Sequence, residues 1–145
     1  GATLIDVIAY PFITDLEAVL KKYPKETWGK YENRLKIGGV KITIDGSPQG
    51  KTAFWSKPLL TPGPGGEENW RGQPLFPPEQ VNAALAKVYA KGIQVFAHCN
   101  GDASIDMMID GARAAGVRAD EDRRTVTVLT DDERPFVIYG EKEGK

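Results

Sequence analysis

The sequence is poor in the residues that form disulfides. Its 145 residues include one cysteine, Cys99, and one histidine, His98. A single cysteine cannot form an internal disulfide, which excludes a small secreted scaffold held together by such bonds. An unpaired thiol suits a reducing compartment, so we expect a cytoplasmic protein. Any chemistry that needs an imidazole has to use His98.

The sequence also lacks an excess of one charge and a long hydrophobic run. It has 19 basic and 20 acidic residues, without a long run of either sign, which argues against binding to nucleic acid or to an anionic membrane. No apolar segment approaches the roughly 20 residues that span a bilayer. We expect a soluble protein whose partners are small molecules or other proteins. The first residue is Gly1 rather than methionine, so we expect Gly1 to be either a residue left over from cloning or a cut inside a longer protein.

The N-terminal segment predicts a strand followed by a helix. Residues 4–13 are rich in β-branched and aromatic side chains, as in a short buried strand that ends near Pro11. Thr14 or Asp15 is a good helix cap, and residues 16–20 carry leucine and valine at helical spacing. This order is the first half of a βα unit.

Two later segments alternate apolar and polar side chains, as strands with two different faces do. In a sheet covered by helices, the apolar set would face the helices and the polar set would point into a cleft or barrel lumen. The apolar residues are Val40, Ile42 and Ile44 in one segment and Ile93, Val95 and Ala97 in the other. The opposite faces carry Lys41, Thr43 and Asp45, and then Gln94, Phe96 and His98.

Two helices and one strand complete the predicted pattern. Residues 77–92 begin with two prolines, carry an apolar stripe and end at Gly92, which is typical of a helix. Residues 103–116 predict another helix, with Asp102 as its cap, and residues 123–129 predict a strand. Strands that alternate with helices predict an α/β fold with a parallel sheet. The pattern alone allows either a barrel or an open doubly wound sheet.

A long loop, residues 56–78, separates the second strand from the clearest helix. It is dense in proline and glycine, which excludes regular structure. A loop of this length in a compact domain is usually functional or disordered. Trp70 and Arg71 favour a loop that covers a site, although an aromatic side chain also commonly anchors a loop to its own core.

Several residues of these segments are candidates for chemistry. Asp45 and His98 fall at the carboxyl ends of predicted strands, where parallel sheets bind ligands. His98 is either a metal ligand or an ordinary hydrogen-bonded residue at a strand end. Lys41, on the inward face, must pair with an aspartate, be neutral or bind something, whereas Cys99 points the other way and is expected to pack in the core. A phosphate-binding loop is excluded, because Asp45 stands where its first glycine is required.

Three ordered motifs make the sequence resemble a known superfamily. They read GGVKITIDGSPQGKTAFWSKPLL, WRGQPLFPPEQVNAAL and GIQVFAHCNGDASIDMMID. Together they resemble the amidohydrolase superfamily, and within it the YtcJ-like metal-dependent hydrolases (amidohydrolase family 3), which include N-substituted formamide deformylases. The resemblance implies a partial (β/α)8 TIM barrel, about its third to sixth strands, over residues 1–128. Residues 129–145 would form a divergent tail, whose PFVIY segment is an edge strand, a hairpin or a frayed end.

The resemblance implies a divalent metal, usually zinc, at the C-terminal mouth of the barrel. His98 would be the metal-ligating histidine of the fifth strand, and Lys41 the inward lysine of the fourth strand, which related enzymes carboxylate to bridge two metals. Neutral imidazole and carbamate oxygen suit zinc, which lowers the pKa of bound water to about 7. The implied reaction is hydrolysis of an amide, formamide or related C–N bond by metal-bound hydroxide. The implied substrate-binding residues are Asp45, Gly46, Ser47, Asn100, Asp102 and Trp70.

Two departures from the family pattern bear on activity. The histidine pair of the family's first strand is absent, and no histidine follows residues 123–128, where the family would show one. The chain therefore lacks the three protein ligands of a typical catalytic zinc, and we expect a fragment that is inactive alone. The alternative is a non-catalytic α/β domain that uses the long loop for binding or self-association. An open half-barrel would expose strand edges, which favours homo-oligomers.

Overall fold

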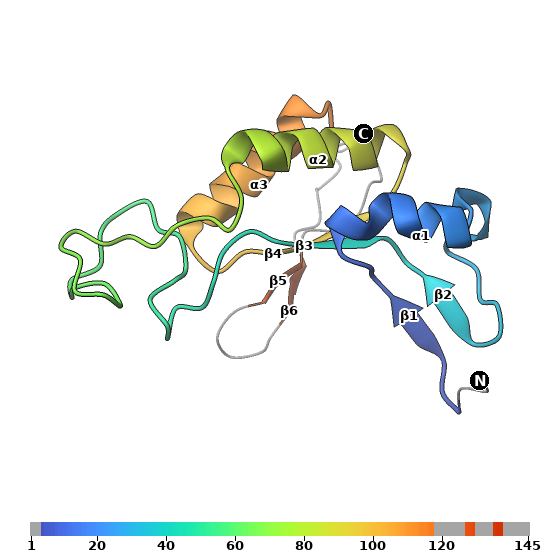
Figure 1. Ribbon diagram of the computed structural model, residues 1–145, viewed down its shortest axis with the longest axis horizontal. Helices are drawn as coiled ribbons and strands as arrows, with labels where there is room; N and C mark the ends of the chain where they lie inside the picture. Colours follow the sequence, from blue (N-terminus) through green and yellow to red (C-terminus); the bar gives the residue numbers. More distant parts are fainter. Residues whose placement is uncertain (1–3, 118–126, 130–134, 138–145) are drawn as a thin grey trace, which may run out of the picture.

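The computed structural model describes residues 4–117, 127–129 and 135–137 (Figure 1). Short strands alternate with helices along most of this length, which confirms the predicted α/β class. The strands are β1 (Val7–Ala9), β2 (Leu35–Ile37), β3 (Val40–Thr43), β4 (Val95–His98), β5 (Thr127–Leu129) and β6 (Pro135–Val137). The helices are α1 (Leu16–Lys22), α2 (Pro78–Ala90) and α3 (Asp102–Ala114), with 3-10 turns at Ile13–Asp15 and Lys25–Thr27.

The strands before α3 pair in parallel. β1 pairs with β2, and β3 pairs with β4. The hydrogen bonds continue between these pairs, because Gly38 N donates to Ala9 O over 3.0 Å and Lys41 N donates to Pro11 O over 2.7 Å. The segment 35–43 thus lies between β1 and β4. β6 pairs antiparallel with β5, which is the hairpin alternative for the C-terminal segment.

Two glycines allow the middle segment to pass between its neighbours. A Cβ atom on Gly39 would lie 2.4 Å from the carbonyl oxygen of Gln94, and one on Gly38 would lie 2.7 Å from the ring of Tyr10. A larger residue at position 39 would force the backbones apart, whereas one at position 38 would displace the side chain of Tyr10. β2, which precedes the glycines, was not predicted from the sequence, because three residues are too few to establish an alternating pattern.

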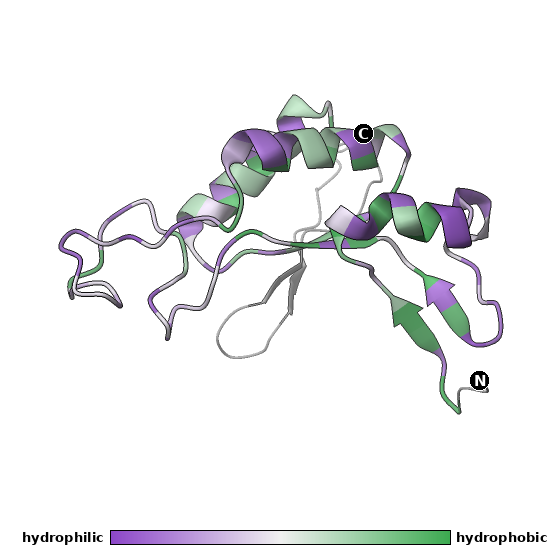
Figure 2. Cartoon of the chain, viewed as in Figure 1, coloured by the Kyte–Doolittle hydropathy of each residue, from purple (hydrophilic) through white to green (hydrophobic). Residues whose placement is uncertain are grey.

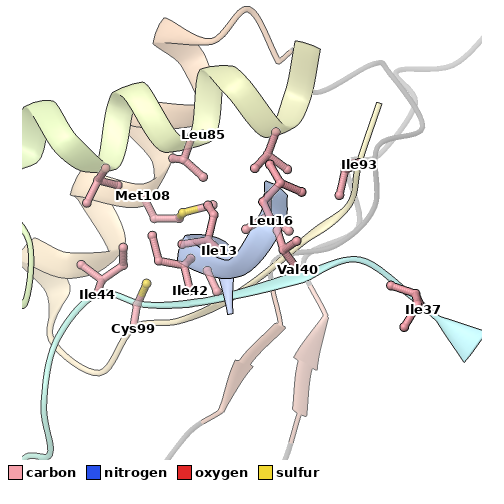
Figure 3. Close-up of a cluster of buried hydrophobic side chains, with 14 of the residues drawn as sticks. Ile13, Leu16, Ile37, Val40, Ile42, Ile44, Leu85, Ile93, Cys99 and Met108 are labelled. Carbon is pink, nitrogen blue, oxygen red and sulfur yellow. The ribbon is translucent and has the colours of Figure 1, made fainter. Parts of the chain in front are cut away.

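The three α-helices lie on one side of β3 and β4 and cover their apolar faces (Figure 1). Val40, Ile42 and Ile44 are each at most 1% exposed and pack with Leu85 of α2 and Met108 of α3 in one buried cluster (Figure 3). This confirms that the apolar set of the alternating pattern faces the helices. The polar set is therefore turned away from them.

The predicted helices form with small changes at their starts. α2 begins at its two prolines, and Gly92, with φ of +62°, follows its end as expected. The residue that precedes α3 is Gly101, and Asp102 is the first residue inside the helix, so its prediction as the cap is wrong. Asp15 does precede α1, but its side chain makes no capping hydrogen bond. The first strand is shorter than predicted, since Ile13–Asp15 already form a 3-10 turn.

The segment between β3 and α2 contains neither helix nor strand, as predicted for its glycine- and proline-rich part. It is nevertheless tied together by backbone hydrogen bonds. Trp55 N donates to Arg71 O over 2.8 Å and Leu59 N donates to Trp70 O over 2.7 Å, so the two arms of the loop run side by side. Leu75 N donates to Ile44 O over 2.7 Å and closes the base of the loop against the end of β3.

Apolar side chains reach the surface at the N-terminal strand. Leu4 is 94% exposed, Ile5 70% and Ile8 48%, and Figure 2 shows β1 in the hydrophobic colours. This edge carries no neighbouring strand among the described residues other than β2. Within the same part of the chain, no helix is both long enough and apolar enough to cross a membrane.

Candidate functional site

The polar faces of β3 and β4 bring two of the predicted site residues together. Lys41 is in register with Phe96, and Thr43 is in register with His98. Because side chains alternate along a strand, all four lie on the face that the helices do not cover. Lys41 and His98 are diagonal neighbours on this face. Alternation in the sequence was sufficient to predict the face on which each side chain lies, whereas the register between the strands comes from the structure.

The amine of Lys41 lacks a hydrogen-bond partner among the described residues. Its Nζ is buried and makes no hydrogen bond within the described part of the chain, and it lies 5.1 Å from the ring centre of Phe96. Burial lowers the pKa of Lys41 from its ordinary value, because the charged form loses its hydration. The aspartate partner that the sequence left open is not supplied by these residues. A buried polar group without a partner is unusual in folded proteins and calls for an explanation.

His98 is half-buried, and its imidazole contacts the side chain of Asn100, two residues later in the chain. The Nε2 atom of His98 lies 2.9 Å from Nδ2 of Asn100. The same Nδ2 donates to the carbonyl oxygen of Gly46 over 2.8 Å. His98, Asn100 and Gly46 are therefore in one hydrogen-bonded chain that links the ends of β3 and β4.

Asp45 is the buried anchor of this region. It is 1% exposed, and its Oδ2 accepts the backbone N–H groups of Phe54 and Gly101 at 2.8 Å each. Its Oδ1 accepts the N–H of Asn100 at 2.9 Å. Both oxygens of this carboxylate are thus bonded to backbone donors, and they hold the loop after β3 against the turn after β4.

The other predicted substrate-binding residues make contacts inside the loop. Asp102 accepts hydrogen bonds from the backbone N–H of Ser56 at 2.7 Å and from its hydroxyl at 2.5 Å. The Ser56 hydroxyl is the main cause of a lowered pKa at Asp102. The Ser47 hydroxyl accepts from Gly50 N over 3.0 Å. Trp70 donates its indole N–H to Lys51 O over 2.5 Å, so it joins the loop to the segment just before it.

Cys99 occupies the position predicted for it. It is 6% exposed and belongs to the apolar cluster under the helices. Burial raises the pKa of its thiol to about 12. A thiol with this pKa is protonated at neutral pH and is a poor nucleophile. Cys99 is therefore a packing residue, as its place opposite His98 predicted.

The described residues supply only part of a metal site. They contain no group of three or more His, Cys, Asp or Glu side chains that could hold a metal ion. His98 has an imidazole of the kind that binds zinc, and Lys41 beside it has an amine without a partner, whereas the carboxylate of Asp45 is already bonded to backbone N–H groups. These two side chains fit a metal as partial contributors to a ligand set.

One part of the site was missed by sequence analysis. The backbone N–H of Phe54 bonds Asp45, and Ser56 bonds Asp102, so residues 54–56 connect the loop to both strand ends. The sequence does not show where backbone donors lie, because every non-proline residue has the same N–H group. The one available signal was Asp45 at the end of a predicted strand, because a carboxylate that is buried there needs hydrogen-bond donors.

Comparison with known proteins identifies the family. The sequence profile described as the amidohydrolase family matches residues 5–139. The chain belongs to this family. The match also extends across most of the described elements, from before β1 to beyond β6.

Two solved structures of metal-dependent hydrolases are similar in fold to this chain. The chain is similar to a metal-dependent hydrolase from Pyrococcus horikoshii OT3, with a TM-score of 0.60 and 30% identity over 77% of this chain and 22% of that chain. It is also similar to a metal-dependent hydrolase from Pyrococcus furiosus, with a TM-score of 0.61 and 26% identity over 88% of this chain and 25% of that chain. The amidohydrolase chain thus spans about a quarter of each.

A curated protein with a different activity in its name is also similar. The chain is 34% identical over 95 residues to a 1-phosphofructokinase of Haemophilus influenzae, which is 61% of this chain and 30% of that protein. The sequence at residues 45–52 does not have the spacing of a phosphate-binding loop, because Asp45 replaces the first glycine. The family match and the two solved hydrolases agree with each other, since both indicate a hydrolase.

Proposed function

We propose that this chain forms part of the active site of a metal-dependent amidohydrolase that hydrolyses an amide, formamide or related C–N bond. The observation that carries the proposal is the buried amine of Lys41, which makes no hydrogen bond to any described residue and lies on the same face as His98. Both residues lie in parallel strands of a chain that belongs to the amidohydrolase family. The substrate class follows the YtcJ-like resemblance of its motifs.

The two side chains have complementary chemistry. We assign His98 and Lys41 as ligands of a divalent metal, zinc by preference, in a partial (β/α)8 barrel. A divalent metal, when bound, polarises the scissile carbonyl and lowers the pKa of water. The amine of Lys41 has to be neutral to form a carbamate with CO2, and its burial favours the neutral form. The carbamate would give Lys41 the oxygen ligands that a hard or borderline cation accepts.

The chain by itself is proposed to be inactive. A catalytic zinc normally has three protein ligands, and the described residues offer two. The long loop after β3, with Trp70, and the residues around Asp45 would shape the pocket for a small amide-type substrate. We place the protein in the cytoplasm and propose neither a nucleic acid nor a membrane as a partner.

A second candidate function is self-association through β1. Its support is the exposure of Leu4, Ile5 and Ile8 beside a strand edge, since contiguous exposed apolar residues often mark interfaces. Size-exclusion chromatography with light scattering measures this directly. An oligomer that Ile8→Glu converts to a monomer would support it, and a monomeric parent chain would refute it.

Metal binding tests the main proposal. Zinc titration of the purified chain, in buffer with and without bicarbonate, is compared for the parent, His98→Ala, Lys41→Met and the exposed control Lys57→Met. We expect His98→Ala to weaken binding at least tenfold, and bicarbonate to strengthen binding in the parent and the control but not in Lys41→Met. Unchanged metal content in His98→Ala would show that the ligand assignment is wrong. Turnover of N-substituted formamides by the isolated chain would contradict its inactivity.

A further inference from the structure

The side-chain amide of Asn100 has a defined orientation. One atom of this amide lies 2.8 Å from the carbonyl oxygen of Gly46 and 2.9 Å from Nε2 of His98. The carbonyl of Gly46 has no hydrogen to donate, so an amide oxygen at this position would face another oxygen without a hydrogen between them. The atom must therefore be the nitrogen. Its two N–H groups point to Gly46 O and to His98.

This orientation determines which nitrogen of His98 carries the proton. An N–H of Asn100 that points at Nε2 requires a lone pair on that nitrogen. In a neutral imidazole, one ring nitrogen accepts and the other carries the hydrogen. We infer that Asn100 is a positioning residue that holds neutral His98 in the form protonated at Nδ1, through an amide anchored on Gly46.

The backbone around Asn100 is held independently of this amide. Asn100 N donates to Asp45 Oδ1 over 2.9 Å and the next residue, Gly101, donates to Asp45 Oδ2 over 2.8 Å. A Cβ atom on Gly101 would clash with the carbonyl group of Phe54, so only glycine fits where the turn packs against the loop. The buried carboxylate thus positions Asn100, and Asn100 positions His98. This gives Asn100, Gly46 and Asp45 a role other than direct contact with substrate.

The tautomer has a consequence for metal binding, which rests on the proposed role of His98 as a ligand. A metal at Nε2 would displace the N–H of Asn100. A metal at Nδ1 would require that nitrogen to lose its proton. The neutral ring would then carry its hydrogen on Nε2, and this hydrogen would face the N–H of Asn100. In either case the bond between Asn100 and His98 has to break before His98 can bind. Asn100 therefore competes with the metal for the imidazole.

Nitrogen NMR of the imidazole tests the tautomer without any metal. His98 is the one histidine in the chain, so a sample labelled with nitrogen-15 gives a single pair of ring signals. We expect the metal-free parent at pH 8.5 to show a protonated Nδ1 and an unprotonated Nε2. In Asn100→Ala this preference should be lost, whereas the control Asn82→Ala on α2 should keep it. A parent protonated at Nε2, or an Asn100→Ala spectrum identical to that of the parent, would overturn the inference.

Zinc titration of the same samples tests the competition. Because a neutral hydrogen bond contributes modestly, Asn100→Ala should bind zinc roughly 2- to 10-fold more tightly than the parent and Asn82→Ala. Weaker binding in Asn100→Ala would show that the amide supports the metal rather than opposing it. If no variant binds zinc while the parent is protonated at Nδ1, the ligand assignment of His98 fails and the positioning role of Asn100 stands. The parent spectrum alone decides the tautomer, even if Asn100→Ala does not fold.

Discussion

Asp45→Asn is the substitution that should most directly test how the site is held. The carboxylate is 1% exposed and accepts three backbone N–H groups, from Phe54, Asn100 and Gly101, at 2.8 to 2.9 Å. Asparagine has the same shape but one oxygen. If that oxygen keeps the bonds to Phe54 and Gly101, the new NH2 group has to face the N–H of Asn100.

The expected cost follows from these three bonds. A hydrogen bond to a charged group contributes about 1.5–3 kcal/mol, and one such bond is lost outright. The two that remain become neutral and roughly half as strong. Relief of the desolvation of a buried carboxylate offsets part of this loss. We expect the free energy of unfolding to fall by roughly 2–3 kcal/mol, a large share of the 5–15 kcal/mol typical of a domain.

Urea denaturation and amide hydrogen exchange measure the two parts of this prediction. The amides of Phe54, Asn100 and Gly101 should lose protection before the rest of the sheet, because they are the groups that lose their acceptor. The matched control is Asp106→Asn on the exposed face of α3, which should change the free energy of unfolding by less than about 0.5 kcal/mol. A similarly small effect in Asp45→Asn, with those three amides unchanged, would refute the view that Asp45 organises the site.

Two further predictions concern Lys41 and Cys99. Lys41→Met should raise the free energy of unfolding by roughly 1 kcal/mol at pH 7 in metal-free protein, because it removes a buried amine without a partner. The lowered pKa of Lys41 means that the unfolded chain binds more protons at this group than the folded chain does. The parent should therefore gain stability relative to Lys41→Met as the pH rises toward 10.5, and the advantage of the variant should shrink. Urea titrations of both proteins at pH 7 and pH 10 that show no such convergence would contradict this. At pH 9 the thiol of Cys99, whose pKa rises from 9.0 to about 12, should be alkylated by iodoacetamide roughly 500-fold more slowly in the folded than in the unfolded protein, because its thiolate fraction falls by that factor. Mass spectrometry that finds rates within tenfold of each other would show the thiol to be accessible. The raised pKa also means that Cys99 contributes stability below pH 9 that is lost as the pH rises from 9 toward 12.

Local patterns were sufficient to predict the elements whose signals lie close together in the chain. α2 has its prolines, its apolar stripe and Gly92 within 16 residues, and each of these acts on the same helix. β2 could not be predicted, because three residues form a strand there through pairing with β1, which lies 28 residues earlier in the chain. The interruption at Gly38 and Gly39 likewise depends on how close Tyr10 and Gln94 come.

The same distinction applies to the site. The shared face of Lys41 and His98 follows from alternation along two strands, which the sequence contains in full. The wrong role for Asp102 as a cap has a non-local cause, since its carboxylate is taken by Ser56, which is 46 residues away. The donors to Asp45 are backbone groups, and every non-proline residue has one. Their arrangement around a carboxylate is therefore visible in the folded protein alone.

The backbone hydrogen bonds at the base of the long loop have a consequence for how such a protein can evolve. Residues 55–59 bond residues 70 and 71, Leu75 bonds the end of β3, and most residues from 60 to 69 are exposed. Doubling the length of a flexible loop costs only about 0.6 kcal/mol of closure entropy. The tip can thus be lengthened, shortened or rewritten by mutation while the strand ends keep their positions. Variation and chemical function are assigned to separate parts of one segment, which lets new specificities arise without rebuilding the scaffold.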